Sequence, residues 1–469
     1  MKIRLCVVAL FILTLSGCVR FDLDKSLSRA NSEFAEFTGG NLQLRRTQEQ
    51  RDNAQSRANA LLESPLTQAA AVELALLNSP TVQVMLANYW DQASGTALSG
   101  SIPNPIFEFG RVSSDDELEI ERLLAIGVLD LLRLPMLSRS ASMQLEAGQV
   151  ALAADVVDLV TRVRQAWVSA VVSRQLSVYA EQIFSSAEAS AKLATNMQAI
   201  GNFNALSRAR QQAFYADGAT NLTVARHQAL ASREALIRLL GLDQGQTESL
   251  RLPDRLPDIP ESPIAAPEIT ATAMQGRLDV NMAMAGLRLA TMQQGLKLAG
   301  EITDIELAAI SESVWQDGDG ESARGYELGI ELPIFKSIGQ VRNRLSARSL
   351  VASNTLEDVT RSAISHLRES YSAYRSSYDI ARHYRDEVVP LQQLISEENV
   401  LNYNGMIIGV FELLADSRAQ IQTVQSSIEA TGQFWLSDAA LRASLVGKPA
   451  TVAVAMAAAG GAGDGGADH

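Results

Sequence analysis

The chain has few of the residues that build covalent or metal-centred sites. Among its 469 residues are only two cysteines, Cys6 and Cys18, both near the N-terminus. If Cys6 is removed with a leader and Cys18 is modified, no cysteine remains for a disulfide, so packing alone must stabilise the mature chain. The four histidines are scattered and have no cysteine pair beside them, so we expect no metal site and no cofactor; they are His227, His366, His383 and His469.

Positive charge is also scarce. The chain carries 40 Lys and Arg against 53 Asp and Glu, for a net charge of −13, and loss of Lys2 and Arg4 with a leader would give −13 − 2 = −15. A nucleic-acid partner is disfavoured, because phosphate binding needs clustered Lys and Arg. No nucleophile, metal or phosphate-binding constellation is present, so the sequence does not indicate an enzyme.

The first 17 residues have the pattern of a secretory signal. Lys2 and Arg4 precede an apolar run, Leu5 to Leu15, that is too short to span a bilayer. The end of the run, Leu15-Ser16-Gly17-Cys18, resembles the bacterial lipobox, in which the cysteine is acylated, typically with palmitate, and becomes the new N-terminus. Val19, in place of Asp, then indicates the outer membrane. The alternatives are an ordinary signal peptide and an uncleaved anchor.

A unit of roughly 200 residues occurs twice in the chain. Leu134-Pro135-Met136 is echoed by Leu332-Pro333-Ile334, an offset of 332 − 134 = 198. Further on, Gly201-Asn202-Phe203 matches Gly409-Val410-Phe411 at an offset of 409 − 201 = 208. We therefore divide the chain into a signal peptide at 1–17, an N-terminal segment at 18–64, a first repeat at 65–251, a proline-rich linker at 252–262, a second repeat at 263–447 and a disordered Ala/Gly-rich tail at 448–469.

Each repeat is predicted to contain a helix, two short strands and two long helical stretches. The first helix is expected over Leu66 to Gly100, between prolines. Strands are expected within about 106–132 and 304–332, each strand region closing at its Leu-Pro pair. In the first region they cover Ile106 to Val112 and continue from Leu118, with a turn at Ser113 to Glu117. In the second they cover about Asp304 to Trp315 and Gly325 to Leu332, with a turn at Gln316 to Glu321. The long helical stretches, Leu137 to Ala199 and Ser337 to Asn402, have apolar residues at coiled-coil intervals and would each extend about 90 to 100 Å. The predicted fold class is mainly α, with long antiparallel coiled-coil helices and a small β part.

The predicted strands alternate between apolar and acidic residues. Such alternation fits a membrane barrel with lipid outside and water inside, although a soluble sandwich can alternate in the same way. Four strands per chain cannot close a barrel, and an open edge in lipid leaves backbone groups unsatisfied, so strands in a membrane would have to come from several chains. The acidic residues predicted to line the lumen are Glu108, Glu119, Glu121, Glu306, Glu327 and Glu331.

In the order and duplication of its motifs, the chain resembles the TolC-like outer-membrane factors. The motifs are Pro103-Asn104-Pro105 before the first strand, the two Leu-Pro pairs, Gly201-Asn202-Phe203, Tyr403-Asn404-Gly405 to Leu414, and Leu240-Gly241. The resemblance implies a homotrimer with a twelve-stranded barrel in the outer membrane and a periplasmic α-helical tube. A periplasmic adaptor protein would dock at the helix-hairpin tips and couple the tube to an inner-membrane pump. The duct itself would catalyse nothing.

The resemblance also assigns roles to residues near the two hairpin tips, about 200–206 and 403–412. Glu412 falls on a position that forms the narrow entrance, whereas Ala415 stands where the family has a second acid, and Asp416 lies one residue beyond. The alternative is that both acids are solvated or paired with Arg208 and Arg210. The residues expected at the adaptor-docking tips are Gly201, Asn202, Phe203, Gly405, Gly409 and Val410. The three glycines would allow tight turns or the close approach of a partner helix.

A second functional class remains open at this point. A lipid-anchored periplasmic coiled-coil protein, structural or an adaptor, could have the same helices while its strands stay out of the membrane. Adaptors usually place one hairpin inside a small lipoyl-like β domain, and this chain has two hairpins without such a domain. The transported substrate is not indicated: metal ions, drugs and proteins all fit.

Overall fold

The structure is a computed structural model that describes residues 20–449 except 40–41, 115–116, 266–275, 303–304, 317–318, 333 and 336. The signal segment, Cys18 and the tail from residue 450 lie outside the described residues. Two compact units are present. Among described residues, the first unit comprises 20–33, Val84–Ala154 and Leu278–Ala363, and the second comprises Phe34–Gln83, Asp155–Arg277 and 364–449. Each unit combines segments from both sequence repeats.

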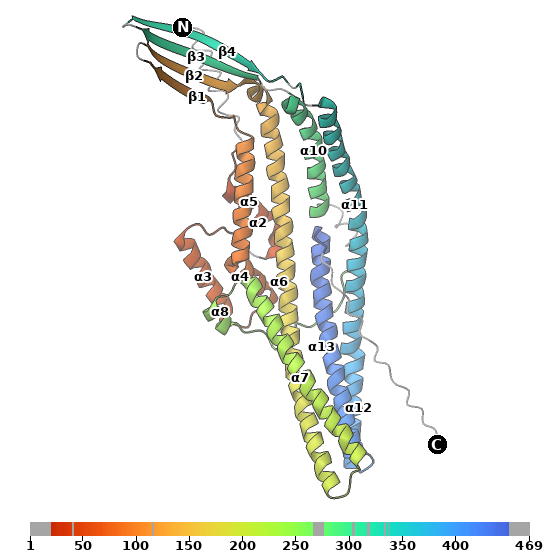
Figure 1. Ribbon diagram of the computed structural model, residues 1–469. Helices are drawn as coiled ribbons and strands as arrows, with labels where there is room; N and C mark the ends of the chain where they lie inside the picture. The colour runs from red at the N-terminus through yellow and green to blue at the C-terminus, as the bar shows by residue number, and fades with distance from the viewer. Residues whose placement is uncertain are drawn as a thin grey trace. The chain divides into compact units, whose positions relative to one another are not determined.

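The first unit contains one antiparallel sheet of four strands in the order β1-β2-β3-β4 (Figure 1). The strands are β1 (Ile106–Ser113), β2 (Glu117–Gly127), β3 (Ile305–Gln316) and β4 (Asp319–Ile330). Neighbours in sequence are therefore neighbours in the sheet, and β1 and β4 form its two edges. The prediction of two strands per repeat, the first beginning at Ile106, is confirmed.

The predicted turn between β3 and β4, Gln316 to Glu321, is too long. Gln316 already pairs with Asp319, and β4 begins there rather than at Gly325. The reason lies in Trp315, which pairs with Gly320 across the strands. A Cβ on Gly320 would come within 2.7 Å of the Trp315 Nε1 atom, so the indole ring lies over the glycine. This contact stabilises Gly320 in the strand, although glycine by itself favours a turn.

The helix after β2 begins earlier than its Leu-Pro pair predicts. Helix α6 spans Val128–Ala199, with Pro135 inside it. Asp130 in the first turn stabilises this earlier start by interacting with the positive end of the helix dipole. In the second repeat, β4 ends at Ile330 and α11 (Ile338–His383) begins only after the Leu-Pro pair. The two strand exits thus differ, and the predicted one at residue 134 is wrong.

The predicted helix from Leu66 to Gly100 is two helices. Helix α4 covers Gln68–Asn78, α5 covers Pro80–Ser99, and the pair is bent by 53°. Ser79 between them is extended, with φ −65° and ψ 125°, because a residue before proline is disfavoured in the helical region. No single helix among the described residues is long and apolar enough to cross a membrane; this bent pair meets the criteria of length and composition.

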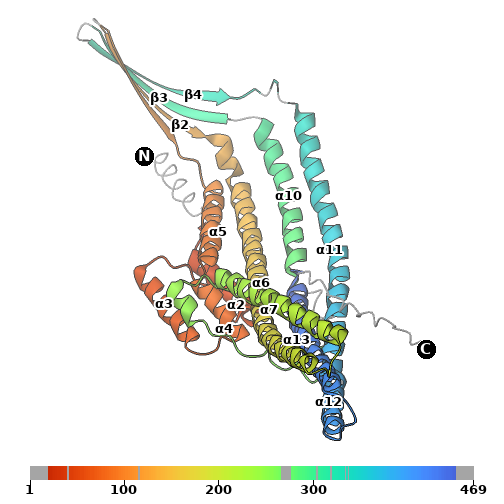
Figure 2. The same ribbon diagram turned by 60° about the horizontal axis from the view of Figure 1, so that its bottom comes forward.

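Helix α10 (Leu278–Ile302) lies beside α11 in both ribbon views (Figures 1 and 2). The Ser349 hydroxyl of α11 donates a 3.4 Å hydrogen bond to Gln294 Oε1 of α10. These two helices and the parts of α5 and α6 in the first unit are continuous in sequence with the four strands. The sheet is therefore attached to helices at the ends opposite its two turns.

The second unit contains two helix hairpins. The first joins α6 to α7 (Ala205–Leu240), and the second joins α12 (Val389–Asn404) to α13 (Val410–Val446). The predicted continuous helix from Ser337 to Asn402 is interrupted, because a π-helical turn, η2 (Tyr384–Val388), separates α11 from α12. Pro390 follows in the first turn of α12, where its missing N–H is tolerated.

The predicted helix-packing stripe of α6 is confirmed by burial: Leu152 is buried in the first unit, and Val156, Leu159, Val163, Trp167 and Val171 are buried in the second. An aromatic group on α11 and α13, with Tyr374, Tyr378 and Phe434, forms the centre of another buried cluster. The proline-rich linker is fixed against this cluster, since Tyr378 Oη donates to the carbonyls of Pro260 and Glu261.

The N-terminal segment is divided between the two units: residues 20–33 belong to the first unit, and the rest of the segment belongs to the second. Helix α3 (Gln48–Leu62) follows α2 (Leu23–Thr38), and α8 (Gln244–Ser249) contacts α3. Arg164 of α6 donates a 2.6 Å hydrogen bond to the carbonyl of Phe37 and stacks over its ring. Burial lowers the pKa of this guanidinium.

Candidate channel wall and entrance

The sheet sorts charge between its two faces. Residues paired across antiparallel strands lie on the same face, so the strand registers assign every side chain to one of the two. On β1 and β2, Glu108, Glu119 and Glu121 lie on the same face. Glu121 pairs with Glu312 of β3, so Glu306 and Ala308, which are in step with Glu312, are on this face too. Ala308 pairs with Glu327, which brings Glu327 of β4 onto it as well. Five of the six acids predicted for a lumen thus lie together; the sixth, Glu331, follows the end of β4.

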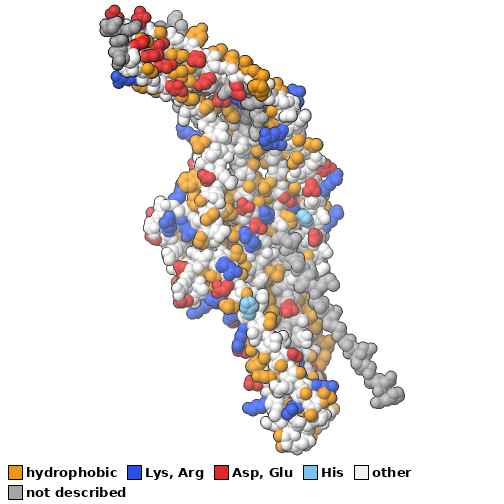
Figure 3. Space-filling model, viewed as in Figure 1, with side chains coloured by type: hydrophobic (Ala, Val, Ile, Leu, Met, Phe, Trp, Pro, Cys, Tyr) orange, Lys and Arg blue, Asp and Glu red, His pale blue; other side chains and the backbone are white. Residues whose placement is uncertain are grey.

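This acidic face also contains acids that the sequence interpretation missed. Glu117 and Asp319 lie at the strand tips, and Glu321 lies in the part of β4 that the sequence predicts to be a turn. Glu312 is on β3 in step with Glu306, so the same alternation could have found it. Of the described strand residues on the acidic face, none is Lys or Arg. Figure 3 shows acidic side chains gathered over the sheet. The acidic face is defined by Glu108, Glu117, Glu119, Glu121, Glu306, Glu312, Asp319, Glu321 and Glu327.

The opposite face is apolar and carries only positive charge. All three arginines of the strands, Arg111, Arg122 and Arg324, are on it, and none of its described strand residues is Asp or Glu. We call it the apolar face. Exposed apolar side chains this extensive mark a surface that contacts another apolar phase. Those on the strands are Phe107, Phe109, Leu124, Leu307, Trp315, Tyr326, Leu328 and Ile330.

The first hairpin tip ends α6 with a Schellman motif. Gly201 has φ +80°, Asn202 N donates to Met197 O, and Gly201 N donates to Gln198 O. Asn204 then caps α7 by accepting a 2.7 Å hydrogen bond from Ser207 N. The predicted turn role of Gly201 is therefore present in the geometry.

At the second tip the turn glycine is not where the sequence suggested. Met406, with φ +59°, is the left-handed residue, and Ile407 N donates to Asn402 O as in a Schellman motif. Gly405 has φ −75° and Gly409 has φ −83°, so neither uses the freedom of glycine. Met406 is 93% exposed. Of the two roles expected for these glycines, the tight turn belongs to the adjacent methionine, which takes the left-handed conformation.

Aromatic and cationic contacts join the two hairpins. The rings of Phe203 and Phe411 stack with centroids 4.3 Å apart, so Phe203 packs between the hairpins and is half-buried. Higher on α13, Arg418 donates a 2.6 Å hydrogen bond to Gln211 Oε1 and lies 3.7 Å above the ring of Phe214. Burial lowers the pKa of Arg418. These contacts hold α13 against the N-terminal part of α7.

The two candidate entrance acids have different surroundings. Glu412, in the first turn of α13, is exposed, whereas Asp416 is half-buried. Asp416 Oδ1 accepts a 3.2 Å hydrogen bond from Gln392 Nε2 of α12, and its Oδ2 is buried without a hydrogen bond. The Asp416 carboxylate is therefore directed toward α12 of its own hairpin, whereas the Glu412 carboxylate is exposed to solvent.

No protein-family model matches the chain, and no curated protein matches it in sequence. Solved structures do match. The outer membrane channel CmeC of Campylobacter jejuni superposes with a TM-score of 0.68 at 14% identity, over 85% of this chain and 87% of CmeC. The outer membrane protein VceC of Vibrio cholerae gives 0.62 at 15% identity, over 84% and 98%. The MtrE outer membrane channel of Neisseria gonorrhoeae, in its open state, gives 0.60 at 15% identity, over 84% and 90%.

The chain has the fold of the TolC-like outer-membrane factors. The resemblance drawn from the motifs is confirmed at this level: a mainly helical chain with a small antiparallel sheet. In this fold, the candidate docking residues lie at the ends of two neighbouring hairpins, and five of the six candidate lumen acids share one face of the sheet.

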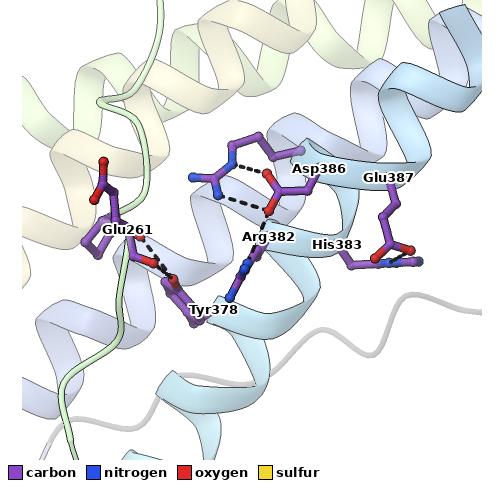
Figure 4. Close-up of polar contacts among 8 residues, drawn as sticks. Glu261, Tyr378, Arg382, His383, Asp386 and Glu387 are labelled. Atoms are coloured by element: carbon purple, nitrogen blue, oxygen red, sulfur yellow. Dashed lines mark hydrogen bonds and ion pairs between the residues drawn. The ribbon is translucent and has the colours of Figure 1, made fainter.

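The π-turn η2 is a feature that no signal in the sequence other than Pro390 indicates. The π-turn η2 carries a charged group, shown in Figure 4, in which Asp386 accepts hydrogen bonds from Arg382 Nε at 3.1 Å and Arg385 Nε at 2.6 Å. Hydrogen bonds from Arg385 and Arg382 lower the pKa of Asp386. His383 Nδ1 lies 3.2 Å from Glu387 Oε2. Hydrogen bonds and an ion pair between side chains therefore stabilise the π-helical turn.

Proposed function

We propose that the protein is a passive exit duct in the bacterial outer membrane, working as a homotrimer in a tripartite efflux system. The observation that carries the proposal is the charge-sorted sheet within a TolC-like fold. A lumen-facing acidic surface and a lipid-facing apolar surface are what a membrane barrel requires. The acidic face would favour cations in an aqueous lumen.

The open edges of the sheet support assembly with further copies. Strands β1 and β4 each have one unpaired side, and unpaired N–H and C=O groups in lipid are unfavourable by several kcal/mol each. Three chains contributing four strands each would close a twelve-stranded barrel and continue as an α-helical tube in the periplasm. In this proposal the two sequence repeats, 65–251 and 263–447, both contribute walls to one duct.

The ends of the chain would place the duct in the membrane. Acylation of Cys18 after removal of residues 1–17 would anchor the N-terminus in the lipid of the outer membrane, with segment 18–64 against the periplasmic helices. Two or three acyl chains hold firmly, whereas one gives marginal binding.

The hairpin tips are the proposed docking site for a periplasmic adaptor, which would connect the duct to an inner-membrane pump. Besides Gly201, Asn202 and Gly409, the tips expose four large apolar side chains that the sequence interpretation did not single out: Ile200, Leu206, Met406 and Ile407. Exposed apolar residues around small turns suit a partner helix hairpin. Phe203 and Val410 are half-buried and would support the tips rather than contact the adaptor.

At the same end, Glu412 is the proposed entrance acid. In a trimer, three copies of an exposed carboxylate near the axis would favour the entry of cations. Asp416 would act with it only if its hydrogen bond to Gln392 were released.

Conductance measurements test the proposal. Purified protein in planar bilayers should give small cation-selective currents that increase on Glu412→Gln, and native mass spectrometry should show three chains. Glu397→Gln, on exposed α12, is the matched control and should leave the current unchanged. A protein that stays non-conducting even as the Glu412→Gln, Asp416→Asn double variant would contradict the duct and favour the lipid-anchored coiled-coil alternative.

A further inference from the structure

Three arginines occupy adjacent rows of the apolar face. Arg122 pairs with Phe109 on one side and Ser311 on the other, and Ser311 pairs with Arg324, so Arg122 and Arg324 share a row. Arg111 is one row closer to the strand tips, paired with Ile120. Arg111 and Arg324 are exposed, and Arg122 is half-buried. We call these three residues the basic belt.

Serine side chains lie beside the arginines of the basic belt. Ser311 and Ser322 lie in its two rows, and Ser313, in the upper row, accepts a 3.5 Å hydrogen bond from Arg122 Nη1. The acids that could otherwise neutralise the arginines are on the acidic face. The sheet therefore presents three guanidinium groups and several hydroxyls outward, without a carboxylate on the described strand residues of the same face.

An apolar zone lies directly below the belt. Its rows contain Phe107, Leu124 and Tyr326, then Leu307 and Leu328. The row of Arg122 is six residues from Ile305 at the base of β3, which corresponds to about 20 Å along the strand. The described residues that follow β4 are also exposed, among them Phe335 at 99% exposure.

We propose that the basic belt binds phosphate groups of lipid headgroups in the outer leaflet. This rests on the proposed function, because the belt lies at a headgroup level only if the apolar zone is in the membrane. Arginine at the bilayer midplane is unfavourable by about 2–4 kcal/mol but nearly neutral at the interface, so the apolar zone below and the arginines above fix the level of the boundary. Guanidinium forks bind phosphate oxygens in pairs, and neighbouring serines supply further donors.

The test uses the full-length protein in non-ionic detergent, with lipid A carrying two phosphates, its dephosphorylated counterpart and inorganic phosphate as probes. Native mass spectrometry counts the bound lipid. Wild type should retain the phosphorylated lipid in preference. Affinity should fall about fivefold for each arginine replaced by glutamine, and about a hundredfold for the Arg111→Gln, Arg122→Gln, Arg324→Gln triple variant.

Two further variants keep the result interpretable. A triple Arg→Lys belt variant preserves charge and should retain more of the binding than the glutamine variant. A matched control replaces three exposed arginines of the second unit, Arg238, Arg251 and Arg368, by glutamine and should bind as wild type.

Equal binding of phosphorylated and dephosphorylated lipid, or unchanged binding by the glutamine belt variant, would overturn the inference. Saturation of the belt by inorganic phosphate alone would overturn it too, since that result indicates a simple anion site. Conductance separates the two proposals: a conducting protein without phosphate preference refutes the belt alone, whereas a protein that neither inserts nor conducts refutes both.

Discussion

The ring of Phe203 stacks on that of Phe411 with centroids 4.3 Å apart and an interplanar angle of 21°. The two residues lie at the tips of different hairpins, so this contact couples the hairpins at the end where an adaptor is proposed to dock. Aromatic pairs contribute about 0.5–1.5 kcal/mol beyond their buried area. A double-mutant cycle with Phe203→Ala and Phe411→Ala should therefore give a coupling energy of about 1 kcal/mol in urea unfolding. Additive effects of the two substitutions would show that the contact does not stabilise the tips.

The two tips should respond differently to substitution of their turn residues. Gly201→Ala places a Cβ at φ +80° and should destabilise the protein by about 1–2 kcal/mol. Gly409→Ala, at φ −83° with nothing within 4 Å of the added Cβ, is the matched control and should have little effect. Met406→Gly should stabilise the protein by about 1 kcal/mol, because it removes left-handed strain. Denaturant titration measures all three, and destabilisation by Met406→Gly would contradict the assigned turn.

Gly241 combines a left-handed conformation with a close approach to another segment. It has φ +66°, and an added Cβ would lie 2.4 Å from Pro80 Cδ and 2.7 Å from Ser79 Cα. Gly241→Ala should therefore cost more than Gly201→Ala, where the Cβ meets nothing within 4 Å, by about 1–3 kcal/mol for the overlap. Equal losses of unfolding free energy in the two variants would mean that the α4–α5 break does not pack against the end of α7.

The ion pairs of the π-turn predict a pH dependence. Because the Arg385 and Arg382 hydrogen bonds lower the folded-state pKa of Asp386, their contribution is complete above the unfolded-state pKa and is lost as the pH falls through the folded-state value. Asp386→Asn should therefore destabilise the π-turn at neutral pH and have a diminishing effect in acid. Hydrogen exchange of Tyr384–Val388 at pH 6 and below pH 4 measures this. A difference that persists unchanged in acid would rule out the ionised carboxylate as the cause.

The sequence predicts the strands well where alternation is unbroken. Alternation such as that of Phe107-Glu108-Phe109 places β1 and the start of β2 correctly. Five of the six predicted lumen acids share one face, because alternation determines the face on which a side chain lies. The start of β4 could not be predicted locally: Gly320 favours a turn until Trp315 covers it from the neighbouring strand. The sequence pattern also left Glu117, Asp319 and Glu321 in apparent turns.

Local residue preference fails at the hairpin and at the strand exit for a related reason. A glycine beside a turn is the expected left-handed residue, yet Met406 takes that conformation while Gly405 does not. Pro135 normally stops a helix, but its position inside the long, packed α6 shows that tertiary packing outweighs one missing hydrogen bond. Such choices depend on contacts between distant segments, which no local pattern contains.

The central claim is that the acidic face lines water and the apolar face contacts lipid. The most direct test is the accessibility of single introduced cysteines in protein reconstituted in vesicles, since the proposed processing of Cys6 and Cys18 leaves no other thiol. A membrane-impermeant thiol reagent should modify Glu121→Cys and Glu312→Cys but not Leu124→Cys or Leu328→Cys. Equal labelling at all four positions would place both faces of the sheet in water and contradict the account.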